Sequence, residues 1–186
     1  MSTLKVSTIS PLGTDASKTI TVGASGDTFK LTDGITVSGA GANTPAFGVY
    51  GNGTSVSANS YTKIDFQNEA YDTDSAFDTS NSRFTVPTGK AGYYWFTIVL
   101  APDKGVTFTD WRAQLYKNGS AGAQSAGFFN FVSDTKDVSG DFPSITGSCV
   151  VNLVVCDYIE VYGYQNSGGS RTFNWPFFQG HRLIGA

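Results

Sequence analysis

Residues 80–100, SNSRFTVPTGKAGYYWFTIVL, contain the two strand-like segments around which we organise the fold. Residues 83–86 alternate polar and apolar side chains. Residues 93–100 form a nearly unbroken aromatic and β-branched run, which is typical of a strand covered on both faces. Between them, Pro87 cannot donate a hydrogen bond to a sheet and Gly89 relaxes the backbone. The stretch therefore predicts two strands joined by a turn or corner, against which the other strands pack.

The composition of the whole chain favours an all-β protein. Of its 186 residues, 14% are aromatic and 15% are charged, compared with a usual charged share of about 25%. Gly, Thr and Val are abundant, and no long stretch has apolar residues at helical spacing. The net charge is −3 without any cluster of Lys or Arg, which argues against nucleic-acid binding. We therefore expect one all-β domain with an appendage.

Features of the sequence also bear on its location. No apolar run is long enough to span a bilayer, so we expect no membrane insertion. The first ten residues lack the continuous apolar segment of a signal peptide, which predicts synthesis and assembly in a cytoplasm. On one extended strand, Cys149 and Cys156 would lie about 20 Å apart, too far for a disulfide. We interpret both cysteines as free thiols and as small buried apolar residues.

Residues 1–44 are predicted to form a β-rich N-terminal stalk. They contain a single aromatic residue, and the motif ITVG at 20–23 returns as ITVS at 35–38. One such chain buries too little apolar surface to fold alone, whereas three chains wound together would bury an apolar stripe on a common axis. That arrangement is similar to the triple-stranded shafts of viral fibres, and a flexible tether is the alternative. The candidate axis residues are Ile20, Val22, Phe29, Leu31, Ile35 and Val37.

Residues 45–186 are predicted to form one antiparallel β-sandwich head. Runs of alternating or β-branched residues are separated by turn signals at regular intervals, which suggests a sandwich or jelly roll. We expect hairpin turns at Asn52-Gly53, at Asn118-Gly119 and across Cys156-Asp157. The predicted strands cover residues 46–50, 62–67, 111–117, 128–132, 149–155, 158–164 and 175–184.

The order and spacing of motifs in residues 45–186 resemble the globular head of complement component one, subcomponent q, which shares its jelly roll with the tumour necrosis factors. Three positions depart from the family pattern: residues 88–91 are additional, Cys156 replaces a turn glycine, and His181 replaces an aromatic residue. The resemblance implies a jelly roll and a compact homotrimer. The matching motifs are PAFGV at 45–49, Phe66, Asn68, Tyr71-Asp72, FTVP at 84–87, GYYWF at 92–96, LYKNG at 115–119, Gly147, Ser148, Leu153 and Asp157.

Aromatic side chains on the predicted outer faces also favour association. Residues 93–96 place aromatic rings on both faces of one strand, but a sandwich uses only the inner face for its own core. The outward rings need a further partner, for which a neighbouring protomer is the natural choice. Shielding by loops of the same chain is the alternative. The candidate residues of the trimer interface are Tyr93, Trp95, Tyr158, Tyr162, Tyr164 and His181.

Catalytic and metal-binding chemistry finds little support in the sequence. No nucleophile elbow, phosphate-binding loop, dinucleotide fingerprint or Cys/His metal spacing is present, and the single histidine has no evident nucleophile partner. We therefore expect no enzymatic activity, no catalytic residue and no cofactor. Asp134, Asp137 and Asp141 share one polar loop and are the candidate calcium ligands, with a solvated acidic loop as the alternative.

These features together predict a homotrimeric bacteriophage appendage, a tail-fibre or head-fibre subunit, which attaches to other virion proteins through residues 1–44. Its jelly-roll head would bind a host surface receptor, a glycan or a protein, through loops at the ends of the strands. A capsid or tail decoration protein that only stabilises the particle is the alternative. The candidate receptor-loop residues are Asp103, Lys104, Asp134, Lys136, Asp137, Asn166 and Arg171.

Overall fold

The computed structural model of this chain describes residues 43–103, 110–121, 130–133 and 144–183. The predicted stalk, with its axis residues Ile20, Val22, Phe29, Leu31, Ile35 and Val37, lies outside the described residues, so the division at residue 44 stays a prediction.

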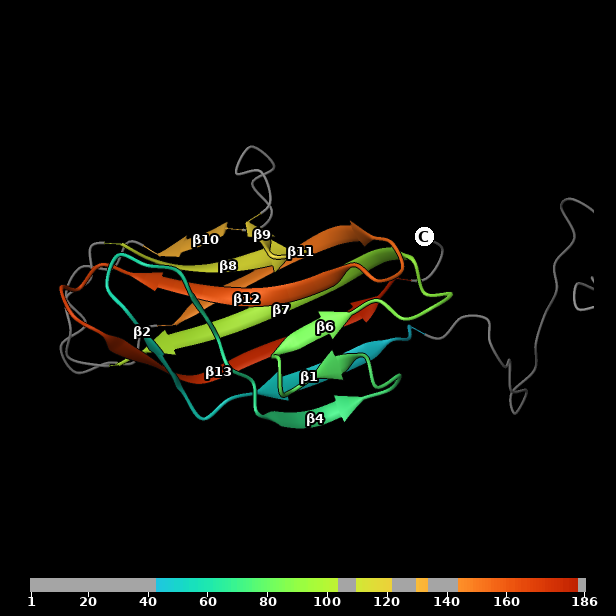
Figure 1. Ribbon diagram of the computed structural model, residues 1–186, viewed down its shortest axis with the longest axis horizontal. Helices are drawn as coiled ribbons and strands as arrows, with labels where there is room; N and C mark the ends of the chain where they lie inside the picture. The colour runs from blue at the N-terminus through green and yellow to red at the C-terminus, as the bar shows by residue number, and fades with distance from the viewer. Residues whose placement is uncertain (1–42, 104–109, 122–129, 134–143, 184–186) are drawn as a thin grey trace, which may run out of the picture. The chain divides into compact units, whose positions relative to one another are not determined.

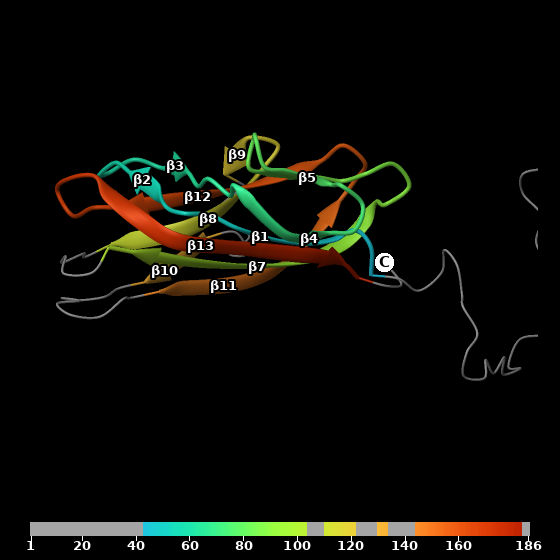
Figure 2. The ribbon, with the colours of Figure 1, turned by 90° about the horizontal axis from the view of Figure 1, so that it is seen from below.

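Two antiparallel sheets face each other and form a jelly-roll sandwich (Figure 1). Seen from below in Figure 2, β7, β11 and β13 lie in one layer, and β3 and β12 lie in the other. Sheet A has the order β11 (Ile145–Leu153), β7 (Gly92–Pro102), β13 (Arg171–Arg182), β1 (Ala46–Tyr50), β4 (Asn68–Asp72), with β2 (Thr54–Val56) also paired to β13. Sheet B has the order β10 (Asn130–Ser133), β8 (Trp111–Lys117), β12 (Tyr158–Gln165), β6 (Arg83–Thr85), β5 (Phe77–Asp78), with β3 (Thr62–Lys63) on β12 and β9 (Ser120–Ala121) on β8. The predicted all-β jelly roll is confirmed.

Alternation along β7 divides its side chains between the core and the outer face. Tyr94, Phe96 and the two aliphatic residues that continue the alternation are fully buried, whereas the residues between them are exposed or half-buried. Phe47 of sheet A stacks on Phe84 of sheet B with ring centroids 4.9 Å apart, which joins the two sheets. A Cβ atom at Gly180 would lie 2.4 Å from the ring of Phe96, so this part of the core is closely packed. Within one protomer β7 is therefore covered on one face, not on both.

The predicted corner between β6 and β7 is confirmed, because β6 belongs to sheet B and β7 to sheet A. The predicted hairpin across Cys156-Asp157 is wrong. β11 pairs with β7 in sheet A, whereas β12 pairs with β8, β6 and β3 in sheet B. The turn instead carries the chain from one layer to the other. The Asp157 carboxylate accepts hydrogen bonds from the backbone of Val154 and the side chain of Asn118, and thereby ties this turn to the β8–β9 hairpin.

The two Asn-Gly turns have different outcomes. Asn118 and Gly119 have φ angles of 53° and 74° and close the β8–β9 hairpin, as predicted. Asn52-Gly53 does not form a hairpin, because β1 and β2 do not pair with each other. Both strands instead pair with β13, at successive positions along it. The Asn52-Gly53 segment therefore interrupts the strand pairing along one edge of β13.

The two cysteines are free, as predicted, but only one is buried. Cys149 faces the core from β11, and burial raises the pKa of its thiol to about 11. Cys156 is exposed, so its predicted burial is wrong. Its φ of 70° lies in the left-handed region, which glycine adopts without strain and other residues adopt rarely. Cys156 therefore has a backbone conformation that normally favours glycine.

Candidate functional site

The outward side chains of four neighbouring strands of sheet A, β11, β7, β13 and β1, include aromatic rings and no charged group, whereas the edge strand β4 carries exposed Glu69. Trp95 and His181 lie next to each other on this face, with ring centroids 5.4 Å apart. Tyr93 is 47% exposed and Val150 is 46% exposed. Among the described residues, the outward positions of β11, β7, β13 and β1 include no Asp, Glu, Lys or Arg. These positions, named here the sheet A face, are Thr146, Ser148, Val150, Asn152, Tyr93, Trp95, Thr97, Val99, Phe177, Gln179, His181 and Tyr50.

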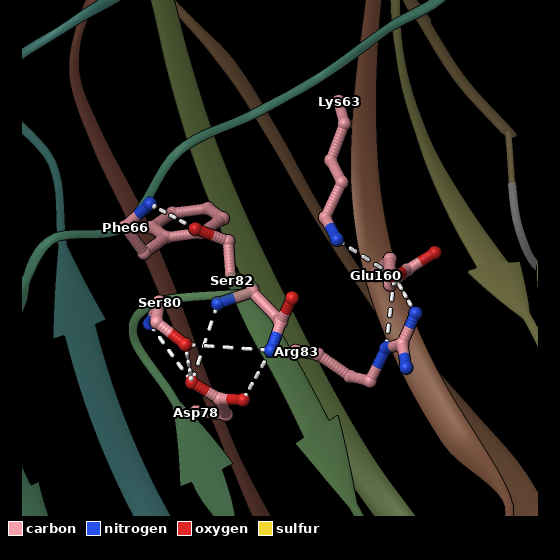
Figure 3. Close-up of polar contacts among 8 residues, drawn as sticks. Lys63, Phe66, Asp78, Ser80, Ser82, Arg83 and Glu160 are labelled. Atoms are coloured by element: carbon pink, nitrogen blue, oxygen red, sulfur yellow. Dashed lines mark hydrogen bonds and ion pairs between the residues drawn. The ribbon is translucent and has the colours of Figure 1, made fainter.

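The outer face of sheet B is, by contrast, charged and internally paired (Figure 3). Glu160 on β12 is only 3% exposed, and its Oε1 accepts hydrogen bonds from Lys63 Nζ at 2.7 Å and from Arg83 Nη2 at 2.7 Å. Burial alone would raise the pKa of Glu160, but these two hydrogen-bonding cations outweigh burial and hold the pKa below its usual value. Arg83 also lies over the Tyr158 ring, 3.9 Å from its centroid.

The turn before β6 fixes the position of Arg83. Asp78 accepts hydrogen bonds from the side chains of Ser80 and Asn81, and these bonds lower the pKa of Asp78 to about 2. The hydroxyl of buried Ser82 accepts a hydrogen bond from the backbone N–H of Phe66 at 2.8 Å. Figure 3 shows Lys63 and Arg83 approaching Glu160 from different strands, so three segments distant in the sequence share one buried carboxylate.

Tyrosines cover the rest of the sheet B outer face. Tyr116 stacks on Tyr162 with ring centroids 3.8 Å apart, and Tyr61 lies 5.1 Å from Tyr164. The guanidinium of Arg112 lies 5.3 Å from the Tyr164 centroid and donates a 2.8 Å hydrogen bond to the carboxylate of Asp110. These tyrosines are half-buried and pack against neighbours in the same chain.

The six candidate interface residues are thus divided between two opposite faces. Tyr93, Trp95 and His181 lie together on the sheet A face. The three candidates on β12 are half-buried and point outward from sheet B. One flat interface cannot include both groups, because the core separates them. The β12 candidates are Tyr158, Tyr162 and Tyr164.

The described ends of the candidate receptor loops gather at one end of the sandwich. Strand register places Trp111 beside Gln165, and Pro102 beside Phe173. The chain enters β1 at the other end, where Ala46 pairs with His181 and His181 with Trp95. Seven residues along β7 separate the two ends by about 23 Å. Figure 1 shows the same polarity, since β7 ends at the left and β1 begins at the right.

The described receptor-loop candidates form the scaffold of this end. The Asp103 carboxylate accepts hydrogen bonds from Thr172 N at 3.0 Å and from Asn174 Nδ2 at 2.7 Å. Asn166 Oδ1 accepts a 3.0 Å hydrogen bond from the backbone N–H of Asp110, and Arg171 Nε donates to Ser167 Oγ at 3.0 Å. The remaining candidates, Lys104, Asp134, Lys136, Asp137 and the possible calcium ligand Asp141, lie outside the described residues.

Gln165 is the residue at this end that sequence reasoning missed. Its side chain is fully buried, donates from Nε2 to the carbonyl of Gly169 at 2.7 Å, and accepts at Oε1 from the backbone N–H of Ser167 at 2.7 Å. One amide therefore shapes the whole β12–β13 turn. A glutamine at an inward position of an alternating strand was the available sequence signal, because a buried amide must be hydrogen-bonded.

The described residues contain no group of three or more His, Cys, Asp or Glu side chains placed to hold a metal ion. Within the same segments, no helix has the length and apolarity needed to cross a membrane.

No family model matches this chain. The uncharacterised protein YqcC of Bacillus subtilis strain 168 is 28% identical over 120 residues, which cover 60% of this chain and 30% of YqcC. The chain therefore spans about a third of the length of this curated relative.

Solved structures share the sandwich. The globular domain of zebrafish complement 1qA superposes with a TM-score of 0.55 at 19% identity, covering 75% of this chain and 97% of that one. The vertex protein P5 of phage PRD1 gives a TM-score of 0.56 at 18% identity, covering 77% and 99%. The Eiger tumour necrosis factor of S. frugiperda gives 0.53 at 14% identity, covering 76% and 93%. The head of this chain therefore has the complement-q and tumour-necrosis-factor jelly-roll fold.

Proposed function

We propose that this chain is the subunit of a trimeric virion appendage, a tail fibre or head fibre, whose jelly-roll head binds a carbohydrate receptor on the host surface. The fold likeness to a phage vertex protein supports the assignment to a virion. By its name that protein belongs to a particle vertex, which favours a head fibre over a tail fibre. No catalytic step is part of the proposal.

The observation that carries the proposal is the uncharged sheet A face. The cores of protein interfaces are depleted in charged residues and enriched in aromatic residues, and this face has both properties. Its four strands, spaced about 4.8 Å apart over about nine residues, cover roughly 600 Å². A standard interface takes about 800 Å² from each partner, which is of the same order. The charged face of sheet B pairs its own ions and would remain in water.

The polarity of the sandwich supports a receptor at the far end. The chain enters β1 at one end, and the connections that carry the receptor-loop candidates leave from the other. Half-buried Tyr61 and Tyr164 lie beside this second end, next to the guanidinium of Arg112. Tyrosine combines an apolar ring with a polar hydroxyl, which suits contact with a sugar ring. An exposed loop end held by a rigid scaffold is a common position for binding residues.

A decoration protein that stabilises the particle is the second candidate, and the name of the vertex-protein neighbour favours it equally. The two functions differ in one measurable respect. A receptor-binding head added in excess occupies host receptors and blocks adsorption of the virion, whereas a free decoration protein leaves adsorption unchanged.

Two measurements on the full chain test the proposal. Sedimentation equilibrium is expected to give the mass of three chains, and a single-chain mass at micromolar concentration would contradict the trimer. Binding to Bacillus subtilis cells and to their purified cell-wall polysaccharide is the first receptor assay, because the curated relative is from that organism. Labelled protein that binds neither these cells nor a panel of immobilised glycans would contradict receptor binding. Immunogold labelling of virions then locates the chain on head or tail.

A further inference from the structure

Gln114 carries a buried amide on the outer face of sheet B. It lies on β8 between Ala113 and Leu115, which are fully buried in the core, so alternation turns its side chain outward. The side chain is nevertheless only 1% exposed, and no residue that the structure describes forms a hydrogen bond with its amide. Buried amides are almost always hydrogen-bonded, so a partner from outside the chain would satisfy this group.

Tyrosine rings surround this amide. Tyr162 lies directly opposite Gln114 in the register of β12 with β8, and Tyr116 follows two residues along β8. The rings of Tyr116 and Tyr162 are stacked, with centroids 3.8 Å apart. In the next row of the sheet, Tyr164 lies opposite Arg112. The three rings are half-buried, so each leaves part of its surface in water.

Tyr61 is the ring that covers the amide. It precedes β3, and its centroid lies 6.3 Å from that of Tyr116 and 5.1 Å from that of Tyr164. Its hydroxyl accepts a 3.4 Å hydrogen bond from Arg112 Nη1. Because Gln114 lies between Arg112 and Tyr116 on β8, these three contacts enclose its position on the sheet. The hydrogen bond is long and Tyr61 belongs to no strand, so the ring can turn aside without disturbing the sheet.

The charges of this face indicate a neutral ligand. Lys63 and Arg83 share the Glu160 carboxylate. Arg112 donates to the Asp110 carboxylate at 2.8 Å. A charged ligand would have to compete with these ion pairs, and an apolar ligand would leave the amide unsatisfied. A neutral sugar fits both conditions, because its hydroxyls donate and accept hydrogen bonds while its C–H groups pack on aromatic rings.

We propose that the tyrosines around Gln114 bind a neutral sugar residue of the host-surface carbohydrate. The sugar packs on the exposed parts of the rings, the Tyr61 ring turns aside, and a sugar hydroxyl forms hydrogen bonds with the Gln114 amide. The inference rests on the proposed function, because it names the site and the class of sugar for that receptor. It places this contact on the outer face of sheet B and not on the end loops.

Gln114→Met is the informative variant. Methionine keeps the length of the side chain and removes the buried amide, so the melting temperature is expected to be equal or higher. Tyr164→Leu removes one ring of the site. Tyr71→Leu is its matched control, since Tyr71 is 47% exposed and lies on β4 of sheet A.

Binding of the full-length proteins to panels of immobilised neutral and acidic glycans is then measured, after circular dichroism has confirmed that each is folded. We expect Q114M and Y164L each to raise the dissociation constant for a neutral glycan about tenfold or more, and Y71L to leave it unchanged. If Y164L does not fold, Q114M decides the test by itself.

The outcomes separate this inference from the proposed function. A wild-type protein that binds no glycan of either panel overturns the carbohydrate receptor itself. Neutral-glycan binding that Q114M leaves unchanged gives the amide a structural role and overturns this site, while the receptor function stands. Wild-type binding confined to acidic glycans overturns the neutral ligand. Loss of neutral-glycan binding in Q114M, with an undiminished melting temperature and with normal binding of Y71L, supports the inference.

Discussion

Replacing Glu160 with glutamine tests how much its ion pairs stabilise the protein, because the substitution removes one charge and little volume. Lys63 Nζ, Arg83 Nε and Arg83 Nη2 all donate to Oε1 of Glu160, at 2.7, 2.9 and 2.7 Å. Removing one partner of a fully buried ion pair costs about 3–5 kcal/mol. Here the cations are 28% and 36% exposed and can regain water, so we expect Glu160→Gln to lower the free energy of unfolding by about 2 kcal/mol.

The effect should depend on pH with a definite sign. The folded-state pKa of Glu160 lies below its usual value of 4.5, because the hydrogen bonds from Lys63 and Arg83 outweigh burial. The stabilisation by the carboxylate is therefore fully present above pH 4.5 and is lost as the pH falls through the folded-state pKa. The stability difference between wild type and E160Q should be largest near neutral pH and should shrink in acid.

Urea unfolding at one fixed protein concentration measures this difference, since assembly makes stability depend on concentration. With a slope of about 2 kcal/mol per molar urea, the E160Q midpoint should fall by about 1 M. Glu69→Gln is the control: Glu69 is exposed and forms no ion pair with any residue that the structure describes, so its midpoint should not move. An unchanged E160Q midpoint at pH 7, or a difference that grows in acid, would refute the reasoning.

Two further predictions concern packing and thiol exposure. Gly180→Ala should destabilise the protein by about 3 kcal/mol, because its new methyl group meets a buried ring at 2.4 Å. Gly48→Ala should cost less than about 1 kcal/mol, since the Tyr71 ring that it meets is 47% exposed and can turn away; equal melting temperatures for the two variants would contradict this account. A thiol-specific reagent should label Cys156 in the folded protein but reach Cys149 only on unfolding, because Cys149 is buried and its pKa is raised to about 11. Rapid labelling of both thiols without denaturant would show the Cys149 site to be open.

Local patterns in the sequence predicted much of the fold. Alternation predicted β8 with its observed bounds. Ile64 and Phe66, at alternating positions of the predicted strand 62–67, are both fully buried even though the observed strand ends at Lys63. The Asn118-Gly119 turn was predicted because positive φ at both positions is needed by a tight hairpin and is tolerated by these residue types. Such features depend on neighbouring residues alone.

Strand partners were harder to predict. Turn residues set the direction of the backbone, but they do not decide whether the next strand pairs with the previous one or crosses to the opposite sheet. For this reason we predicted hairpins at Asn52-Gly53 and at Cys156. Neither turn joins two strands that pair with each other. The resemblance to a jelly-roll family supplied the two-sheet topology that the local signals lacked.

By itself, the sequence determined that the chain is an all-β sandwich and where most of its long strands run. Only the tertiary structure decided which outer face each outward ring occupies: Trp95 and His181 lie on an uncharged surface, and Tyr162 lies on the opposite one, stacked on Tyr116. It also decided the exposed position of Trp175 in a bulge of β13. The physical reason is that alternation is a property of one strand, whereas a shared surface is created by hydrogen-bonded partners that lie far apart in the chain.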